Sequence, residues 1–184
     1  MQQKQSNIIE KMHFDSMPDK DYYLTEFRNC SFSNIALSDF SKCKFVGCDL
    51  SNCTVSGSSL QEVSFTDCKL MGIIFYDVND FGFSIHCQNC ILDYCSFDNK
   101  KTNTSSFKEC RMHGVSFNRA DINRSKFVNC DLLHAVFLET NIKGIDFKTN
   151  SNLQMDLSNN LVKKTKFSPE QLHGLLSHYD IIIE

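Results

Sequence analysis

Large apolar side chains recur at every fifth position along most of the sequence. A spacing of five fits neither the 3.6-residue repeat of a helix nor the two-residue repeat of a strand. It predicts a chain that turns a corner every five residues and points one large side chain inward from each face. The first run is Phe40, Phe45, Leu50, Val55, Leu60, Phe65, Leu70 and Phe75, and Phe27, Phe32 and Leu37 precede it with the same spacing. The second run is Leu92, Phe97, Thr102, Phe107, Met112, Phe117, Ile122, Phe127, Leu132, Phe137, Ile142 and Phe147, in which only Thr102 is polar.

A small or medium side chain lies two positions before each large one, and cysteine often fills that place. Nine of the ten cysteines do so, and Cys87 is the exception. Free cysteine packs as a small hydrophobic residue and a buried thiol is unreactive, so this register favours packing over a metal or redox site. The C-x-x-C pair of Cys87 and Cys90 is the motif that leaves the alternative open. The predicted core has large positions Phe45, Leu50, Phe65, Leu70, Phe97, Phe107, Phe117, Phe127, Phe137 and Phe147, and small positions Cys43, Cys48, Cys53, Cys68, Cys90, Cys95, Cys110 and Cys130.

Several five-residue units carry a recognisable motif, among them GCDLS (47–51), RADIN (119–123) and NCDLL (129–133). They resemble the A(D/N)LXX motif of the pentapeptide-repeat family over about residues 25–157. That resemblance implies an all-β fold, a right-handed quadrilateral parallel β-helix with four units in each coil. Phe97, Phe117 and Phe137 are then expected to stack, as are Phe107, Phe127 and Phe147. Coils about 4.8 Å apart would make a rod about 30 Å long.

The five-residue spacing slips twice, between Leu37 and Phe40 and between Phe75 and Leu92. A slip can be a structurally neutral correction of the coil register, or a loop that leaves the coil. Loops on a regular scaffold often carry binding residues. The second slip includes Phe81, Phe83 and His86, which we treat as a candidate partner-binding loop.

The two ends of the chain have weaker periodicity. Residues 1–24 are expected to form an N-terminal cap, with a short helix over residues 8–14. Residues 158–184 are expected to form a C-terminal helix and tail, with Ser168 as N-cap, Pro169 at the first helical position and Gln171 completing a capping box. One apolar stripe of this helix could cover the last coil, but relatives of the Qnr type pair end to end through a similar ending, which implies a homodimer. The stripe comprises Leu172, Leu175, Leu176 and Tyr179.

The composition suggests few chemical functions. No enzyme motif, cofactor motif or histidine cluster is present, so we expect no catalytic residue, metal or cofactor. No apolar run is long enough for a membrane span and the N-terminus lacks the apolar core of a signal peptide, so we expect a cytoplasmic protein with reduced thiols and no membrane partner. The net charge of −3 gives no reason to expect direct binding to nucleic acid.

Two functional hypotheses follow, besides a metal or redox protein suggested by the cysteines alone. The first is a non-enzymatic interaction rod for an unidentified protein partner. The second comes from the resemblance, since Qnr-type relatives bind the type II topoisomerases DNA gyrase and topoisomerase IV as DNA mimics and protect against quinolones or toxins. A DNA mimic needs acidic faces. Residues 21–99 carry ten acids and four bases, whereas residues 100–156 carry nine bases and six acids, a mixed distribution that favours the first hypothesis.

Overall fold

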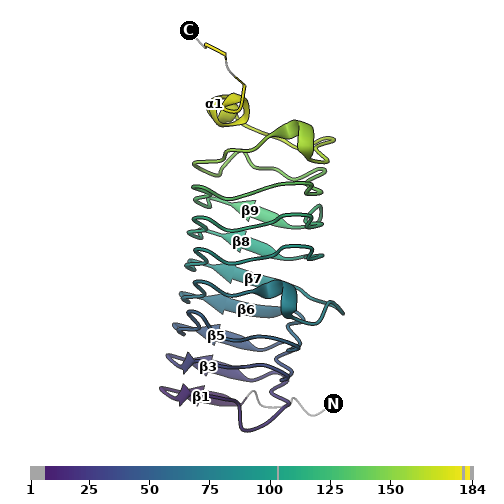
Figure 1. Cartoon of the computed structure of the whole chain (residues 1–184). Helices are drawn as coiled ribbons and strands as arrows, with labels where there is room; N and C mark the ends of the chain where they lie inside the picture. The colour runs from purple at the N-terminus through teal and green to yellow at the C-terminus, as the bar shows by residue number, and fades with distance from the viewer. Residues whose placement is uncertain (1–6, 103, 180, 183–184) are drawn as a thin grey trace, which may run out of the picture.

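The chain folds as a stack of rectangular coils, with the N-terminus at one end and a short helix at the other (Figure 1). The computed structural model describes residues 7–102, 104–179 and 181–182. One face of the stack is a parallel sheet in the order β1-β3-β5-β6-β7-β8-β9, and β2 pairs with β4 on the next face. The strands are β1 (Ile8–Glu10), β2 (His13–Phe14), β3 (Glu26–Arg28), β4 (Ser31–Phe32), β5 (Lys44–Val46), β6 (Val63–Thr66), β7 (Ile85–Gln88), β8 (Ser106–Lys108) and β9 (Lys126–Val128).

The remaining faces are held by single parallel bridges between successive coils, such as Ser96 with Ser116 and Asp121 with Asn141. The helical elements are η1 (Phe75–Asp77), η2 (Leu157–Asn159), η3 (Pro169–Gln171) and α1 (Leu172–Leu176). Together these elements form a parallel β-solenoid with four faces, as the five-residue spacing predicts. No helix in the described part of the chain is long and apolar enough to cross a membrane.

Each corner of a coil is a tight turn that follows a large core residue. In one example, the N–H of Ala120 donates to the carbonyl of Phe117 at 3.0 Å, and Arg119 between them has a φ of 55°. A positive φ at the third residue defines a type II turn, which favours Gly, Asn or Asp at that place. Gly72 occupies a corner of this type, where the N–H of Ile73 donates to the carbonyl of Leu70. Asn89 and Asn129 also have a positive φ, at the corners that follow β7 and β9. The turn explains why the spacing is five: three residues form a face and two form the corner.

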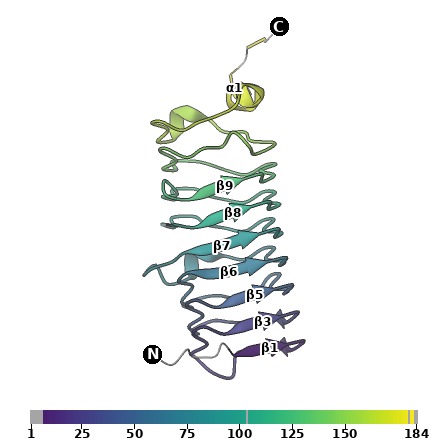
Figure 2. The ribbon, with the colours of Figure 1, turned by 180° about the vertical axis from the view of Figure 1, so that it is seen from behind.

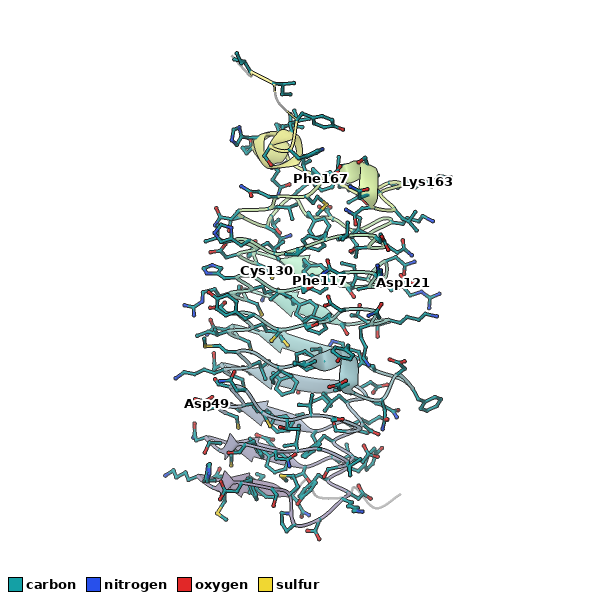
Figure 3. The ribbon with its side chains drawn as sticks, in the orientation of Figure 1. Asp49, Phe117, Asp121, Cys130, Lys163 and Phe167 are labelled. Carbon is teal, nitrogen blue, oxygen red and sulfur yellow. The ribbon has the colours of Figure 1, made fainter. Side chains whose placement is uncertain are left out.

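All of the side chains given above as the predicted core, ten large and eight small, are buried. Phe117 lies between Phe97 and Phe137, with ring centroids 5.2 Å apart in both pairs. Phe127 stacks on Phe107 at 5.1 Å and is 5.4 Å from the tilted ring of Phe147. Figure 3 shows Phe117 and Cys130 inside the stack. Stacked aromatic rings fill the narrow interior closely.

The two slips in spacing are coils of unusual length. Phe27 pairs with Phe45, a separation of 18 residues, whereas Phe65 pairs with Cys87, a separation of 22. In the short coil Ile35 is the buried residue and Leu37 is 70% exposed at a corner. Extending the regular spacing to Leu37 was therefore wrong. The two missing residues of this coil fall between Phe32 and Ile35, and the spacing of five resumes from Ile35 to Phe40.

The described part of the N-terminal segment forms a further coil. The expected helix over residues 8–14 was wrong: β1 pairs with β3 and β2 pairs with β4. Pairing with the exposed edge of the next coil satisfies backbone groups that a helix there would leave unpaired. At the other end, bridges from Asn141 to Leu161 and from Asp146 to Lys166 extend the solenoid past residue 157.

Candidate interaction surface

The predicted partner-binding loop protrudes from the side of the stack between β6 and β7 (Figures 1 and 2). Phe81 is 84% exposed on it, so this residue can contact a partner. Phe83 is fully buried, with its ring 6.1 Å from that of Phe75. His86 belongs to β7, where its Nδ1 lies 2.9 Å from the hydroxyl oxygen of Ser106. The three residues therefore do not form one surface: Phe81 is exposed, Phe83 is in the core and His86 is half-buried on β7.

A buried lysine holds this loop from the coil above. The side chain of Lys100 is 1% exposed, and its Nζ donates to the carbonyl oxygens of Tyr76 (3.4 Å) and Val78 and to the carboxylate of Asp80 (2.8 Å). The same ammonium lies 5.1 Å from the centre of the Phe83 ring. Burial of an ammonium requires such partners. The nine bases counted in residues 100–156 include Lys100, whose charge therefore does not contribute to the surface of the rod.

The sequence carried a signal for this arrangement. Lys100 lies two positions before Thr102, so both inward positions of this five-residue unit are polar. The unit belongs to the coil that follows the one with two extra residues. Thr102 pairs through its hydroxyl with that of Ser125, and both are buried. Cys87 departs from the pattern in the same region, because it occupies a large position between Phe65 and Phe107. Lys100, Thr102 and Cys87 thus all depart from the repeat in the coils next to the loop.

The other nine cysteines pack at the small inward positions. In one column Cys68 donates to the carbonyl of Thr66 at 3.2 Å, and Cys110 donates to that of Lys108 at 3.3 Å. All ten thiols are free and buried. Burial raises the pKa values of Cys43, Cys53 and Cys95 to about 12. Among the described residues, no group of three or more His, Cys, Asp or Glu side chains is arranged to hold a metal ion.

The C-terminal helix covers the last coil. The Gln171 amide donates to the carbonyls of Phe147 (2.9 Å) and Asn150 (2.7 Å), and its oxygen accepts from the N–H of Ser168 at 2.9 Å. A Cβ on Gly174 would lie 2.0 Å from the carbonyl oxygen of Leu153, so the helix lies directly against the coil backbone. α1 is shorter than the helix expected from the sequence, because a 3-10 turn, η3, precedes it.

The predicted dimer stripe is divided by this packing. Leu175 is buried against the coil, which contradicts its assignment to an intermolecular interface. Leu176 is half-buried, whereas Leu172 and Tyr179 are each 52% exposed. Ile181 and Ile182 of the tail are also exposed, and Asp180, Ile183 and Glu184 lie outside the described residues. An apolar surface therefore remains on the helix after it has covered the coil.

Comparisons with known proteins agree with this architecture. A family model described as a pentapeptide repeat region matches residues 100–175, and one described as pentapeptide repeats (8 copies) matches residues 38–75. A search of curated proteins finds no match. A solved structure of trypsin-treated QnrB1, a plasmid-mediated fluoroquinolone resistance protein, covers 97% of this chain and 92% of its own, with a TM-score of 0.82 and 19% identity. HetL, a pentapeptide-repeat protein involved in heterocyst differentiation regulation from the cyanobacterium Nostoc sp., covers 89% of this chain and 88% of its own, with a TM-score of 0.43 and 15% identity.

Proposed function

The chain belongs to the pentapeptide-repeat family, and from this premise we propose that it is a non-enzymatic rod that binds another protein through its side loop. The observation that carries the proposal is a group of exposed apolar side chains on one coil: Ile74 is 46% exposed, Tyr76 is 51% exposed and Phe81 is 84% exposed. Exposed apolar groups that lie together are typical of protein interfaces, and aromatic residues often dominate their binding energy.

The anchor of this loop supports the proposal. The three acceptors of Lys100 belong to Tyr76, Val78 and Asp80, which immediately precede the exposed Phe81. A loop that is fixed before binding loses less conformational entropy on complex formation. Lys100 therefore presents Phe81 in a defined position.

A photo-crosslinking experiment tests the side-loop interface. A photoreactive phenylalanine analogue replaces Phe81 in one variant and Tyr94 in a control, because Tyr94 is also an exposed aromatic, at 70% exposure, and lies at a corner of the next coil. We expect one protein to be captured from position 81 and not from position 94. The purified partner should then bind the wild-type protein and the Tyr94→Ser variant, but bind Phe81→Ser about tenfold or more weakly. Equal binding by both variants would contradict the proposal.

A second candidate function is binding of a type II topoisomerase. It is favoured by the similarity to QnrB1 over nearly the whole length of both chains, because QnrB1 is described as a fluoroquinolone resistance protein. The acidic half of the rod, residues 21–99, has the sign of charge that a DNA mimic requires. A gyrase supercoiling assay with a quinolone tests this function. Unchanged inhibition at saturating protein eliminates it and leaves the first proposal standing.

A further inference from the structure

Positive charge in the C-terminal half is concentrated on two adjacent faces of the stack. The first face includes the bridge from Lys101 to Asp121, and the second includes the pair of Ser106 and Lys126. Figure 3 shows Asp121 and Lys163 at the same edge of the stack. Between residues 101 and 168 these two faces hold nine bases and three acids, whereas the other two faces hold two bases and three acids. We call the nine bases the basic corner: Lys101, Lys108, Arg124, Lys126, Lys143, Lys148, Lys163, Lys164 and Lys166.

Most of these cations lack an acidic partner. Lys108 lies 3.6 Å from Glu109, and Asp146 lies 3.5 Å from Lys148 and 3.9 Å from Lys166. The third acid on these faces, Asp121, accepts a hydrogen bond of 2.9 Å from the Asn141 amide. Within the part of the chain that the structure describes, the other six bases have no carboxylate at ion-pair distance. Such a surface attracts anionic partners.

A groove crosses the basic corner at Gly144. This residue occupies a corner at a φ of 74°, and the space that a Cβ would fill is open. The resulting groove has a volume of about 540 Å³, and Arg124, Lys126 and Lys148 lie along it. The apolar side chain of Val128, which is 39% exposed, also lines the groove. The basic corner therefore offers apolar contacts between its charges.

We propose that the basic corner binds an acidic segment of a partner protein, in which apolar side chains alternate with carboxylates. This inference rests on the proposed role as a protein-binding rod and names a second contact for it. The apolar lining of the groove at Val128 favours a peptide over a phosphate backbone. No exposed aromatic residue among the described residues lies in the basic corner, so the platform that single-stranded nucleic acid uses for stacking is lacking there. An acidic helix would fit this surface well, since its turns repeat every 5.4 Å and the coils repeat about every 4.8 Å.

Fluorescence anisotropy with a defined probe tests the proposal. The probe is a labelled helical peptide with glutamate along one face and leucine among the glutamates; a matched peptide has glutamine in place of glutamate. We expect the acidic peptide to bind at low salt, to bind less tightly in 0.5 M NaCl because of screening, and to bind more tightly than the glutamine peptide. The double variant Lys126→Glu and Lys148→Glu should weaken binding about tenfold or more.

A matched control carries the same charge change outside the basic corner. Lys42 and Lys69 are exposed bases of the N-terminal half, each within 4.0 Å of a carboxylate, and their replacement by Glu should leave peptide affinity unchanged. Gly144→Asn tests the groove without changing charge, because asparagine tolerates a positive φ. We expect this variant to weaken peptide binding while circular dichroism remains unchanged.

Three outcomes overturn the proposal: no binding of the acidic peptide, equal loss of affinity in the Lys42/Lys69 control, or tighter binding of a 20-base-pair DNA duplex than of the peptide. The last outcome would assign the basic corner to nucleic acid. Crosslinking at Phe81 is a separate readout at a different surface. If crosslinking at Phe81 captures a partner while any of these three outcomes is observed, the basic corner is rejected as a peptide site. The proposed function as an interaction rod is then retained.

Discussion

The Nζ atom of Lys100 lies 2.8 Å from Oδ1 of Asp80, which belongs to the preceding coil. The two residues have opposite environments, because the lysine side chain is 1% exposed and the aspartate side chain is 81% exposed. The pair thus connects the interior of the stack to the base of the exposed loop. Its removal should affect the loop before it affects the rest of the solenoid.

Replacing Lys100 by Met should loosen the side loop and lower stability. The backbone acceptors of Tyr76 and Val78 would lose a buried donor, which costs about 1–3 kcal/mol. Hydrogen exchange should accelerate at residues 76–83 and remain slow in β9. Lys101→Met is the matched control, because Lys101 is exposed, and it should change the free energy of unfolding by less than about 0.5 kcal/mol. Equal exchange in the two variants would show that Lys100 does not hold the loop.

Phe81 and Phe83 should respond in opposite ways to the same substitution. Phe83→Ala empties a site in a fully buried core, which typically costs about 3–5 kcal/mol. Phe81→Ala removes a side chain that is 84% exposed, so the free energy of unfolding should change by less than about 0.5 kcal/mol. Urea denaturation of both variants measures the difference. Similar losses of stability would contradict the assignment of Phe83 to the core and of Phe81 to the exposed surface.

The regular parts of the fold could be predicted because each five-residue unit repeats one physical requirement. A large residue such as Phe117 fills the interior, a small or medium one such as Val115 fits beside it, and a turn residue with positive φ, here Arg119, follows. Since neighbouring coils impose this requirement many times, single deviations such as Thr102 do not hide the period. The same regularity predicts that Phe97, Phe117 and Phe137 lie in one stack, as the ring distances show.

The interaction surface was harder to predict because its residues break the repeat. Phe81 and Phe83 are alike in sequence, and only the register of the extra residues decides which one is buried. The role of Lys100 depends on two backbone carbonyl groups, 22 and 24 residues away, and a backbone carbonyl leaves no mark in the sequence. Leu175 likewise belongs to an apolar stripe that the sequence assigns to a single face, whereas the close contact at Gly174 turns part of that stripe towards the last coil.

The buried thiols should not react in the folded protein, whereas all ten should react in the unfolded protein. All ten are buried, so a water-soluble disulfide reagent at pH 8 should label them only as fast as the protein unfolds. In guanidinium chloride the same reagent should titrate ten thiols per chain. Rapid labelling of one or more thiols without denaturant would reveal an accessible cysteine and favour the redox hypothesis.

Stability should also fall in alkaline solution. Burial raises the pKa values of Cys43, Cys53 and Cys95 to about 12, above the ordinary thiol value of about 9. The folded state therefore holds protons that the unfolded state releases, so this contribution is complete below pH 9 and is lost as pH rises from 9 to 12. Thermal unfolding of the wild type and of Cys95→Ala between pH 8 and pH 11 checks this. The wild type should lose more stability over that interval than the variant, and equal losses would assign the alkaline effect to other groups.

The apolar surface left on α1 and the tail predicts a homodimer that forms through the C-terminus. Replacing both Leu172 and Tyr179 by Asp should convert the dimer to a monomer in light scattering, because each side chain is 52% exposed and a buried carboxylate in the interface would be unpaired. Circular dichroism should remain unchanged, since about half of each side chain is exposed to solvent. Leu175→Asp is the contrasting variant: this side chain is buried within its own chain, so the substitution should destabilise the end of the solenoid as well. A monomeric wild-type protein at micromolar concentration would refute the dimer, and a dimeric Leu172/Tyr179 variant would place its interface elsewhere.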